Sequence, residues 1–217
     1  MSDKVLSGLI KFGKRKYMDR LLKDGELHLK NLQYYKKIED DGIRGDNYEG
    51  VLTIRQIPKN YILKYGGKKV GTITSGQFKE EAQFMVSIYC MFGIDNETVE
   101  NNQLYIDRRN FEFGDTCVFI HNVREFAKRC KRVLGERYVK YEFDKVRYYN
   151  QHIFEGEINP APFRKRDIYK YQNEYRIAIA TGHLNDVTEY IGCIEDIAKM
   201  IPIAKLGNFK EFFNEPH

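Results

Sequence analysis

Short segments of alternating or apolar residues, separated by turn residues, run through most of the chain. Pro58-Lys59-Asn60 and Gly66-Gly67 divide three such segments, at Val51–Ile57, Tyr61–Tyr65 and Val70–Thr74. This spacing is typical of antiparallel strands, so we predict a meander here. Because strands do not alternate strictly with helices, the pattern argues against a doubly wound sheet. It favours an α+β fold with mixed, mainly antiparallel sheets and short flanking helices.

The other expected elements follow from periodicity and capping residues. Further strands are predicted at Leu9–Phe12, Glu26–Leu29, Phe84–Met91, Cys117–Ile120, Arg137–Phe143, Tyr175–Ala180, Thr188–Cys193 and near Pro202–Leu206. Helices are predicted over Lys14–Lys23, Leu32–Ile38, Asn122–Leu134 and Ile194–Met200. Gly25 is placed as the C-cap glycine of the first helix. Asn122 and Glu125 have the spacing of a capping box.

Length and composition indicate one folded domain. The 217 residues, 42% hydrophobic and 31% charged, suit a single domain over residues 1–217 and exclude a disordered chain. No apolar run approaches the ~18 residues of a membrane span, and the first residues lack a signal-peptide core, so we expect a cytoplasmic protein without membrane contact. The scattered Cys and His residues show no metal-ligand spacing, so we expect no metal.

The aromatic residues are unevenly distributed by type. The chain has 16 Tyr and 14 Phe but no Trp, with a net charge of +5. Such a composition suits a surface that stacks rings or bases beside phosphates. The codon usage of an AT-rich gene explains the same composition equally well, so both explanations stay open.

The polar loop Asp40–Gly50 is the first candidate for chemistry. It contains Arg44, Asp46 and Tyr48 and follows Tyr34-Tyr35, so it could hold a polar ligand between rings and an arginine. Alternatively, it is a solvated turn in which Asp46 pairs with Arg44 or caps a backbone N–H.

The segment Phe163–Ile177 is the second candidate. It places cations and tyrosines around Glu174, which opens an apolar strand. On a strand, Gln172, Glu174 and Arg176 would share one face. Burying these side chains unpaired is costly, so they lie at the surface, pair internally or line a cleft. An edge strand with an internal Glu174–Arg176 ion pair is the simplest alternative.

The sequence contains no phosphate-binding glycine motif, no G-x-S-x-G and no His-Glu-x-x-His. A metal-dependent nuclease could be assembled only from scattered carboxylates (Asp95, Asp107, Glu112 and Asp115), without a recognisable D…E-x-K core. We therefore place that function last.

The Gln172-Asn173-Glu174 stretch resembles the [Gln/Glu]-x-Glu motif of ADP-ribosyltransferases. The stretch RKRDIYKYQNEYRIAI is also similar to the basic run and following strand of nucleic-acid-targeting bacterial ADP-ribosyltransferase toxins. Other pieces resemble a bacterial and phage domain family: LIKFGKRKYMDRLLKDGELHLKNLQYY, RGDNYEG, MVSIYCMFGI, FGDTCVFIHNVREFAKR and EYRIAI…IGCIEDIA. The likeness covers most of the chain in scattered pieces.

The resemblance implies an ADP-ribosyltransferase-like fold with NAD as co-substrate and no metal. Glu174 would be the catalytic glutamate and Gln172 its companion. Lys11 would stand where the family has Arg or His. Ser87 matches the family's middle motif by order, whereas Thr72-Ile73-Thr74-Ser75 matches it by letters.

The remaining expected roles follow from this chemistry. Tyr34, Tyr35 or Tyr89 would stack nicotinamide or exclude water, and Lys11 and Arg44 would hold the pyrophosphate. A nucleic acid, RNA or DNA, would be guided by basic and aromatic residues of the second candidate segment: Arg164, Lys165, Arg166, Tyr169 and Tyr171. The resemblance also implies a toxin in phage defence or a toxin–antitoxin pair, with an antitoxin or other protein as a partner. The alternative is a non-catalytic protein of phage or defence origin that binds nucleic acid or a partner.

Overall fold

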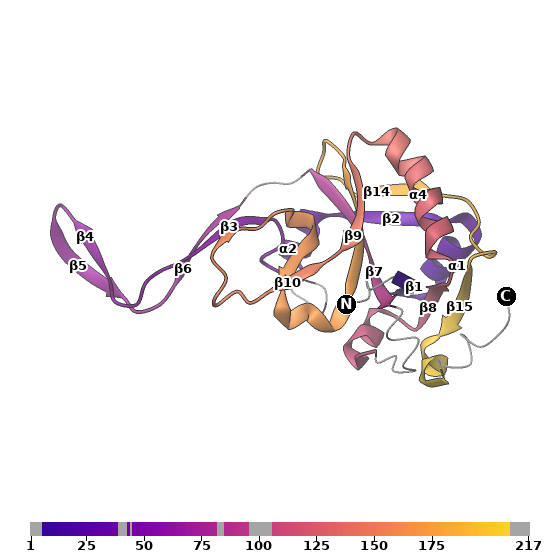
Figure 1. The fold of residues 1–217 in the computed structure, drawn as a ribbon, viewed down its shortest axis with the longest axis horizontal. Helices are drawn as coiled ribbons and strands as arrows, with labels where there is room; N and C mark the ends of the chain where they lie inside the picture. Colours follow the sequence, from indigo (N-terminus) through magenta and orange to yellow (C-terminus); the bar gives the residue numbers. More distant parts are fainter. Residues whose placement is uncertain (1–5, 39–42, 44, 82–84, 96–105, 209–217) are drawn as a thin grey trace, which may run out of the picture.

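The computed structural model describes residues 6–38, 43, 45–81, 85–95 and 106–208. The fold is α+β with mainly antiparallel strands and few, short helices, as predicted. A body built around an eight-stranded main sheet carries a long two-stranded arm that projects to one side (Figure 1).

The main sheet contains strands from both ends of the described chain, in the order β14-β2-β7-β1-β8-β15, with β13 and β9 added through β7. Its strands are β1 (Leu6–Gly13), β2 (Glu26–Asn31), β7 (Val86–Asp95), β8 (Thr116–Ile120), β9 (Tyr141–Lys145), β13 (Glu174–Ala180), β14 (Val187–Tyr190) and β15 (Ala198–Pro202). β7 is the most apolar of the predicted strands and lies centrally, as its composition indicates.

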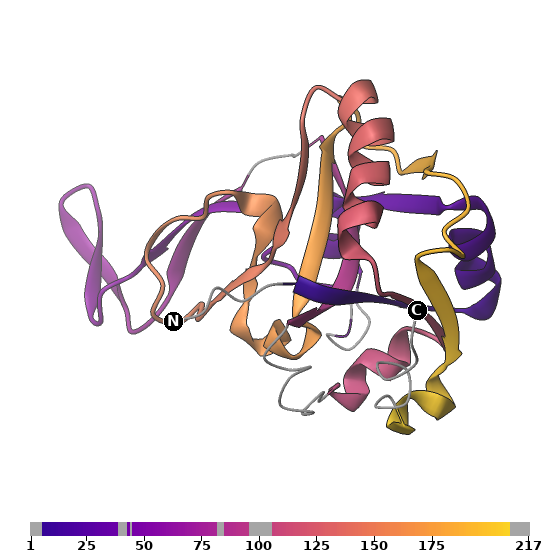
Figure 2. The same cartoon turned by 45° about the vertical axis from the view of Figure 1, so that its right-hand side comes forward.

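Among the described residues, three α-helices flank this sheet: α1 (Arg15–Asp24), α2 (Leu32–Lys37) and α4 (Val123–Arg137). α4 packs Phe126, Cys130 and Leu134 into the main hydrophobic core, and the helix lies across the sheet in Figure 2. The Asn122 side chain accepts a hydrogen bond from the Glu125 backbone N–H (3.0 Å), so Asn122 is the predicted N-cap. Gly25 ends α1 in the left-handed conformation (φ 65°), also as predicted.

One edge of β7 pairs with β13 along most of its length. The other edge is shared by two strands, β1 and β2, and the main sheet is divided between them. On the dividing edge, β2 pairs with Ser87 and Ile88, whereas β1 pairs with residues 92–95. Residues 89–91 therefore have no strand partner on that edge among the described residues. α1 connects β1 to β2 in the chain, and the two strands pair with different parts of β7. The gap between them is visible in Figure 2.

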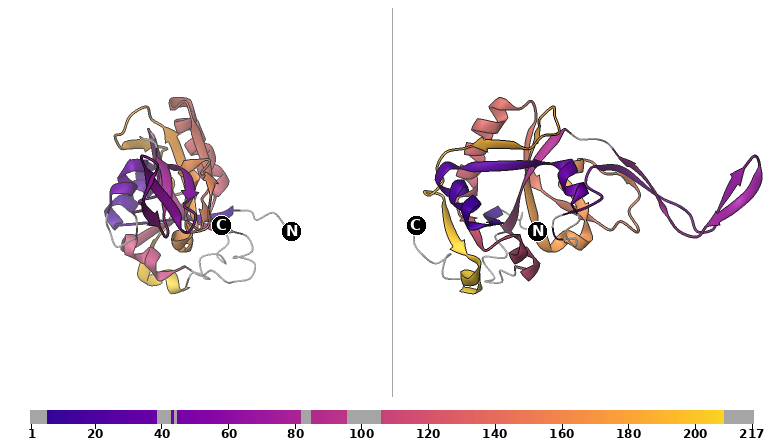
Figure 3. Two further views of the ribbon diagram at one scale, coloured as in Figure 1. Left: turned by 90° about the vertical axis from the view of Figure 1, so that its left-hand side faces the viewer. Right: turned by 180° about the vertical axis from the view of Figure 1, so that it is seen from behind.

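The arm contains the three strands predicted between residues 51 and 74, but they do not pair as the predicted meander. The first strand pairs with a fourth strand that the sequence did not reveal, and the second pairs with the third. β3 (Val51–Gln56) pairs with β6 (Gln77–Glu81) to form its stem, and β4 (Tyr61–Tyr65) pairs with β5 (Lys68–Ile73) to form its tip. Gly66 and Gly67 both have positive φ (55° and 79°), as a two-residue type I′ hairpin turn requires. Figure 3 shows the arm extending away from the body in the view from behind.

The predicted helix Ile194–Met200 is wrong, and so is the strand near Pro202–Leu206. Residues 198–202 form β15, and a 3₁₀ helix, η4 (Ile203–Asn208), follows it. Ile194, Ile197 and Ile201 are spaced as on a helix, but β15 pairs with the buried strand β8. Long-range pairing with β8 therefore overrides the local period.

Short elements around the second candidate segment also differ from the prediction. They are β10 (Arg147–Tyr149), β11 (Gly156–Glu157), β12 (Arg164–Arg166) and the 3₁₀ helices η1 (Arg108–Phe113), η2 (Ala161–Phe163) and η3 (Asp167–Gln172). β12 pairs in parallel with β10, and η3 leads directly into β13. The basic run is therefore folded against the body.

Candidate functional site

A cavity of about 820 Å³ opens where β1 and β2 separate from β7. Its wall includes Tyr89, Cys90 and Met91, the β7 residues that lack a strand partner on this edge. Lys11 of β1 donates a hydrogen bond to the Cys90 carbonyl (2.7 Å) and so satisfies one backbone oxygen that the divided sheet leaves open. The division of the sheet thus creates the cavity.

Several residues singled out from the sequence line this cavity together, although they come from distant parts of the chain. They are Lys11 (β1), Tyr34 and Tyr35 (α2), Tyr89 (β7), Lys165 (β12), Gln172 (η3) and Glu174 (β13). A cavity of this size, with rings and a few polar groups, has the dimensions of a small-molecule or cofactor site. Convergence of these seven residues is the main result of the tertiary structure for function.

Glu174 lies at the inner wall of the cavity and belongs to a buried charge network. Its Oε2 accepts from Arg176 Nη2 (2.8 Å) and lies 3.5 Å from Lys165 Nζ. Arg176 Nη2 also donates to Glu49 Oε1 (2.6 Å), so the guanidinium bridges two carboxylates. The predicted Glu174–Arg176 ion pair is therefore present, but β13 lies between β7 and β9 and is not an edge strand.

The network fixes the charge of Glu174. Burial by itself raises the pKa of this carboxyl, but the charges of Arg176 and Lys165 outweigh burial and lower the pKa from 4.5 to about 2. Burial raises the pKa of Glu49, against the opposing effect of Arg176. Glu174 is thus ionised at neutral pH, and only a small part of the residue (7%) is exposed.

Gln172 holds Lys165 in place beside Glu174. Its Oε1 accepts from Lys165 Nζ (2.7 Å), and its Nε2 donates to the Ile43 carbonyl (2.7 Å). Both ends of the amide are therefore occupied, and the side chain is fixed. Gln172 and Glu174 bond to neighbouring side chains and also line the cavity. From the sequence, internal pairing and lining a cleft are separate alternatives, and the structure combines them.

The cavity wall combines cations with aromatic rings. Lys11 Nζ lies 4.2 Å from the centre of the Tyr89 ring, and Lys30 Nζ lies 4.4 Å from that of Tyr34. Tyr34 and Tyr35 meet edge to face, with their ring centres 5.5 Å apart. These contacts hold positive charge beside ring faces, an arrangement suited to an anionic ligand that carries flat rings.

Sequence reasoning missed two groups of residues at this site. Lys30 and His28 line the cavity from β2, where Leu27 and Leu29 are buried on the opposite face. Simple alternation along β2 contained that signal. Arg176 was recognised only as a partner of Glu174, because the sequence gives no indication that it also binds Glu49.

The polar loop and the basic segment do contact each other. Asp46 Oδ1 accepts from Arg166 Nε (2.7 Å) and from the Tyr48 backbone N–H (2.9 Å). The aspartate therefore caps a backbone N–H, as one alternative held, but it is buried and not part of a solvated turn. Tyr169 Oη donates to the Gly45 carbonyl. Arg44 lies outside the described residues.

The basic segment is not the open nucleic-acid surface that the sequence suggested. Lys165 and Tyr169 are buried, Arg166 pairs with Asp46, and none of the five candidates except Lys165 lines the cavity. Tyr171 stacks against the Arg109 guanidinium (3.6 Å), and Arg164 is half-buried. Asp46 pairs with Arg166 and Glu174 pairs with Lys165, so these two cations point into the body. The sequence of the basic segment alone does not indicate these partners.

Neither candidate for the middle motif lies at the cavity. Ser87 is fully buried where β7 pairs with both β2 and β13, and its Oγ has no hydrogen-bond partner among the described residues. Residues 72–75 lie on the arm. The sheet is closed around Ser87, and it opens only from residue 89 onward.

Within the described ranges, no three His, Cys, Asp or Glu side chains gather as metal ligands. No described helix is both long and apolar enough to cross a membrane.

No protein-family model, no curated protein and no solved structure matches this chain.

Proposed function

We propose that this chain is an ADP-ribosyltransferase-like enzyme that takes NAD into the cavity and transfers ADP-ribose to a nucleic acid, RNA or DNA. The observation that carries the proposal is the meeting of Glu174 and Gln172 with Lys11, Tyr34, Tyr35 and Tyr89 in one cavity of about 820 Å³. The sequence predicts each of these residues as part of a site, and they come from five elements of the fold.

The cavity has groups for each part of a dinucleotide. Lys11 and Lys14 line it and offer ammonium groups to a pyrophosphate, whereas the Lys30 ammonium is bonded to Asp186 (2.7 Å). Tyr34 and Tyr35 offer ring faces or edges for a flat heterocycle. Lys11 therefore fits the place where the family has Arg or His, as a single charge without the bidentate geometry of arginine.

Glu174 suits the chemical step because it stays ionised. NAD, when bound, supplies an ADP-ribosyl group whose bond to nicotinamide breaks with positive charge developing on the ribose. A carboxylate with a pKa of about 2 stabilises that charge throughout the neutral pH range. Gln172 acts as a positioning residue, because its Oε1 accepts from Lys165 Nζ (2.7 Å) and so holds this lysine 3.5 Å from the carboxylate.

A second candidate function is binding without catalysis. Arg176 and Lys165 already neutralise Glu174, and the bridging of Arg176 to Glu49 is what a purely structural network requires. The cavity would then hold an anionic aromatic ligand, and the network would only shape its wall. The two functions differ in whether ADP-ribose is transferred.

The test is to incubate the protein with labelled NAD and single-stranded RNA or DNA, comparing wild type with Glu174→Gln and Glu49→Gln. Glu49 binds the same Arg176 but does not line the cavity, so Glu49→Gln controls for damage to the network. We expect Glu174→Gln to reduce transfer by about 100-fold or more, and Glu49→Gln to keep transfer within tenfold of wild type.

Thermal unfolding of the wild type with and without NAD separates the candidates without any variant. Stabilisation together with transfer supports the enzyme, and stabilisation without transfer supports the binding protein. If NAD neither stabilises the chain nor is consumed, the proposal fails. A role as a toxin in phage defence would additionally require that expression arrests growth of a bacterial host and that Glu174→Gln relieves the arrest.

A further inference from the structure

The tip of the arm, strands β4 and β5 with the turn between them, is exposed on both faces. Every residue of β4 is exposed, and Tyr65 next to the turn has 83% of its surface accessible. A two-stranded hairpin without a packed face is only marginally stable by itself. Exposed Ile62, Leu63 and Val70 add to an apolar surface that nothing in the described chain covers.

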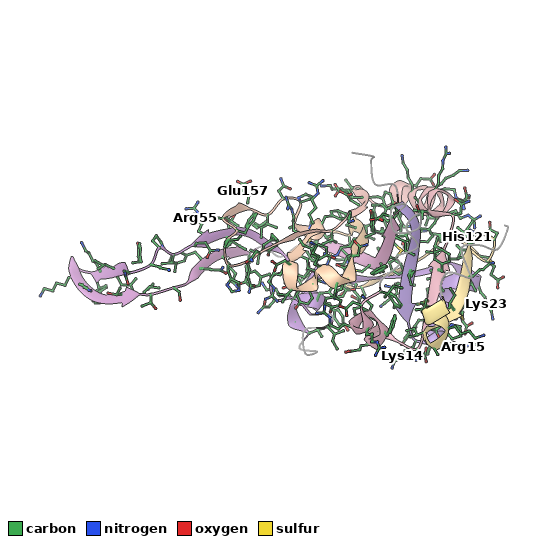
Figure 4. All side chains as sticks on the ribbon, turned by 60° about the horizontal axis from the view of Figure 1, so that its bottom comes forward. Lys14, Arg15, Lys23, Arg55, His121 and Glu157 are labelled. Carbon is green, nitrogen blue, oxygen red and sulfur yellow. The ribbon has the colours of Figure 1, made fainter. Side chains whose placement is uncertain are left out.

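Residues 51–79 of the arm carry charge of one sign. From Val51 to Lys79 the sequence contains no Asp or Glu, whereas six cations occur there: Arg55, Lys59, Lys64, Lys68, Lys69 and Lys79. Lys64, Lys68 and Lys69 of the tip, and Lys59 just before it, form no ion pair with any described residue. Figure 4 shows Arg55 at the stem, far from Lys14 and Arg15 at the other end of the molecule.

Cross-strand pairing brings the tip lysines together. Lys64 lies directly opposite Lys69, and Tyr65 lies opposite Lys68. Like charges facing each other across a hairpin destabilise it. A polyanion bound here would remove that repulsion and would meet lysines and tyrosine rings side by side.

We propose that the tip of the arm binds single-stranded nucleic acid, with its lysines on the phosphates and Tyr61 and Tyr65 stacking on unpaired bases. The inference deepens the proposed function, on which it rests for the identity of the acceptor, and it moves the acceptor surface from residues 164–171 to the arm. Unpaired strands are favoured over a duplex because stacking needs open base faces. A base also has to leave its stack before an enzyme can reach it.

A second copy of this chain is a poorer occupant. Two tips would bring two sets of lysines together without a carboxylate between them. The stem also connects the arm to the cavity wall: Lys36 of α2 pairs with Glu81 of β6, and α2 carries Tyr34 and Tyr35. A strand held on the arm can therefore be led toward the cavity along α2.

Fluorescence anisotropy with labelled 20-mers of dT and U and a 20-base-pair duplex, in the absence of NAD, tests the proposal. The arm variant changes Lys59, Lys64, Lys68 and Lys69 to Gln. The control variant changes four exposed cations of α4, Arg124, Lys128, Lys131 and Arg132, to Gln. Each variant removes four positive charges. A difference in affinity between them therefore reports binding at the arm and not the net charge of the protein.

We expect the arm variant to weaken binding of both single strands by at least tenfold, and to reduce the slope of log K against log salt by about 3. Tyr65→Ala should weaken binding by about tenfold with little effect on folding, because its ring is exposed. Equal loss in the α4 variant, unchanged binding in the arm variant, tighter binding of the duplex, or dimerisation through the arm in place of binding would overturn the inference. Because NAD is absent, binding and transfer can fail independently.

Discussion

Lys165 in the cavity and Lys69 on the arm carry the same charge in opposite surroundings. Lys165 is 3% exposed and contacts Gln172 and Glu174. Lys69 is exposed and faces Lys64. In the cavity, charges compensate one another within the fold. On the arm, compensation has to come from outside the described chain. Removing a charge should therefore have opposite effects on stability in the two regions.

The largest effect is expected from Arg176→Met. This change leaves Glu174 and Glu49 buried without their shared partner, and we expect a loss of about 3–5 kcal/mol in the free energy of unfolding. Urea denaturation measures the loss, with Lys69→Met as the control on the arm. A loss under about 1 kcal/mol for Arg176→Met would contradict the view that the network is a tightly coupled buried unit.

A smaller effect is expected from acid. The pKa of Glu174 is lowered to about 2 by Arg176 and Lys165 in spite of burial, so its ionised form stabilises the fold above the ordinary value of 4.5. That contribution is lost as the pH falls from about 4.5 to about 2. The raised pKa of Glu49 acts in the opposite direction, because its contribution is greatest at low pH and is lost as the pH rises through its folded value.

Comparing wild type with Glu174→Gln isolates the Glu174 contribution, since Glu49 is present in both proteins. We expect the difference in unfolding free energy to be largest near pH 6 and to shrink toward pH 2. The measurement is urea denaturation at a series of pH values. A difference that stays constant over this range would show that Glu174 is not held ionised by its neighbours.

The smallest effect is expected from Lys69→Glu on the arm. A carboxylate opposite Lys64 replaces repulsion by attraction, and we expect the hairpin to gain up to about 0.5 kcal/mol. Hydrogen exchange of the β4 and β5 amides reports this local gain, because the tip can open without unfolding the body. The same variant should bind single strands more weakly. Faster exchange in the variant would contradict the view that repulsion between Lys64 and Lys69 destabilises the hairpin.

Local signals predicted those parts of the fold that local interactions determine. Gly25 closes α1 and Asn122 caps α4, because a left-handed residue and a side-chain cap act within a few residues. Gly66-Gly67 likewise set the turn of the arm. The helix predicted at Ile194–Met200 was wrong because residues 198–202 pair with β8, and local sequence patterns do not indicate this long-range pairing.

For the site, the sequence alone determined which residue types were available: a carboxylate after an amide, tyrosines and lysines in two segments. Only the tertiary structure decided their surroundings. Division of the sheet at β7 brings Lys11 and Tyr89 to the same cavity as Glu174. Lys165 and Arg166 point into the body because they pair with Glu174 and Asp46. The physical reason is that strand pairing and charge compensation join residues far apart in the chain. The tip of the arm keeps its cations exposed because residues 51–79 contain no Asp or Glu to pair with them.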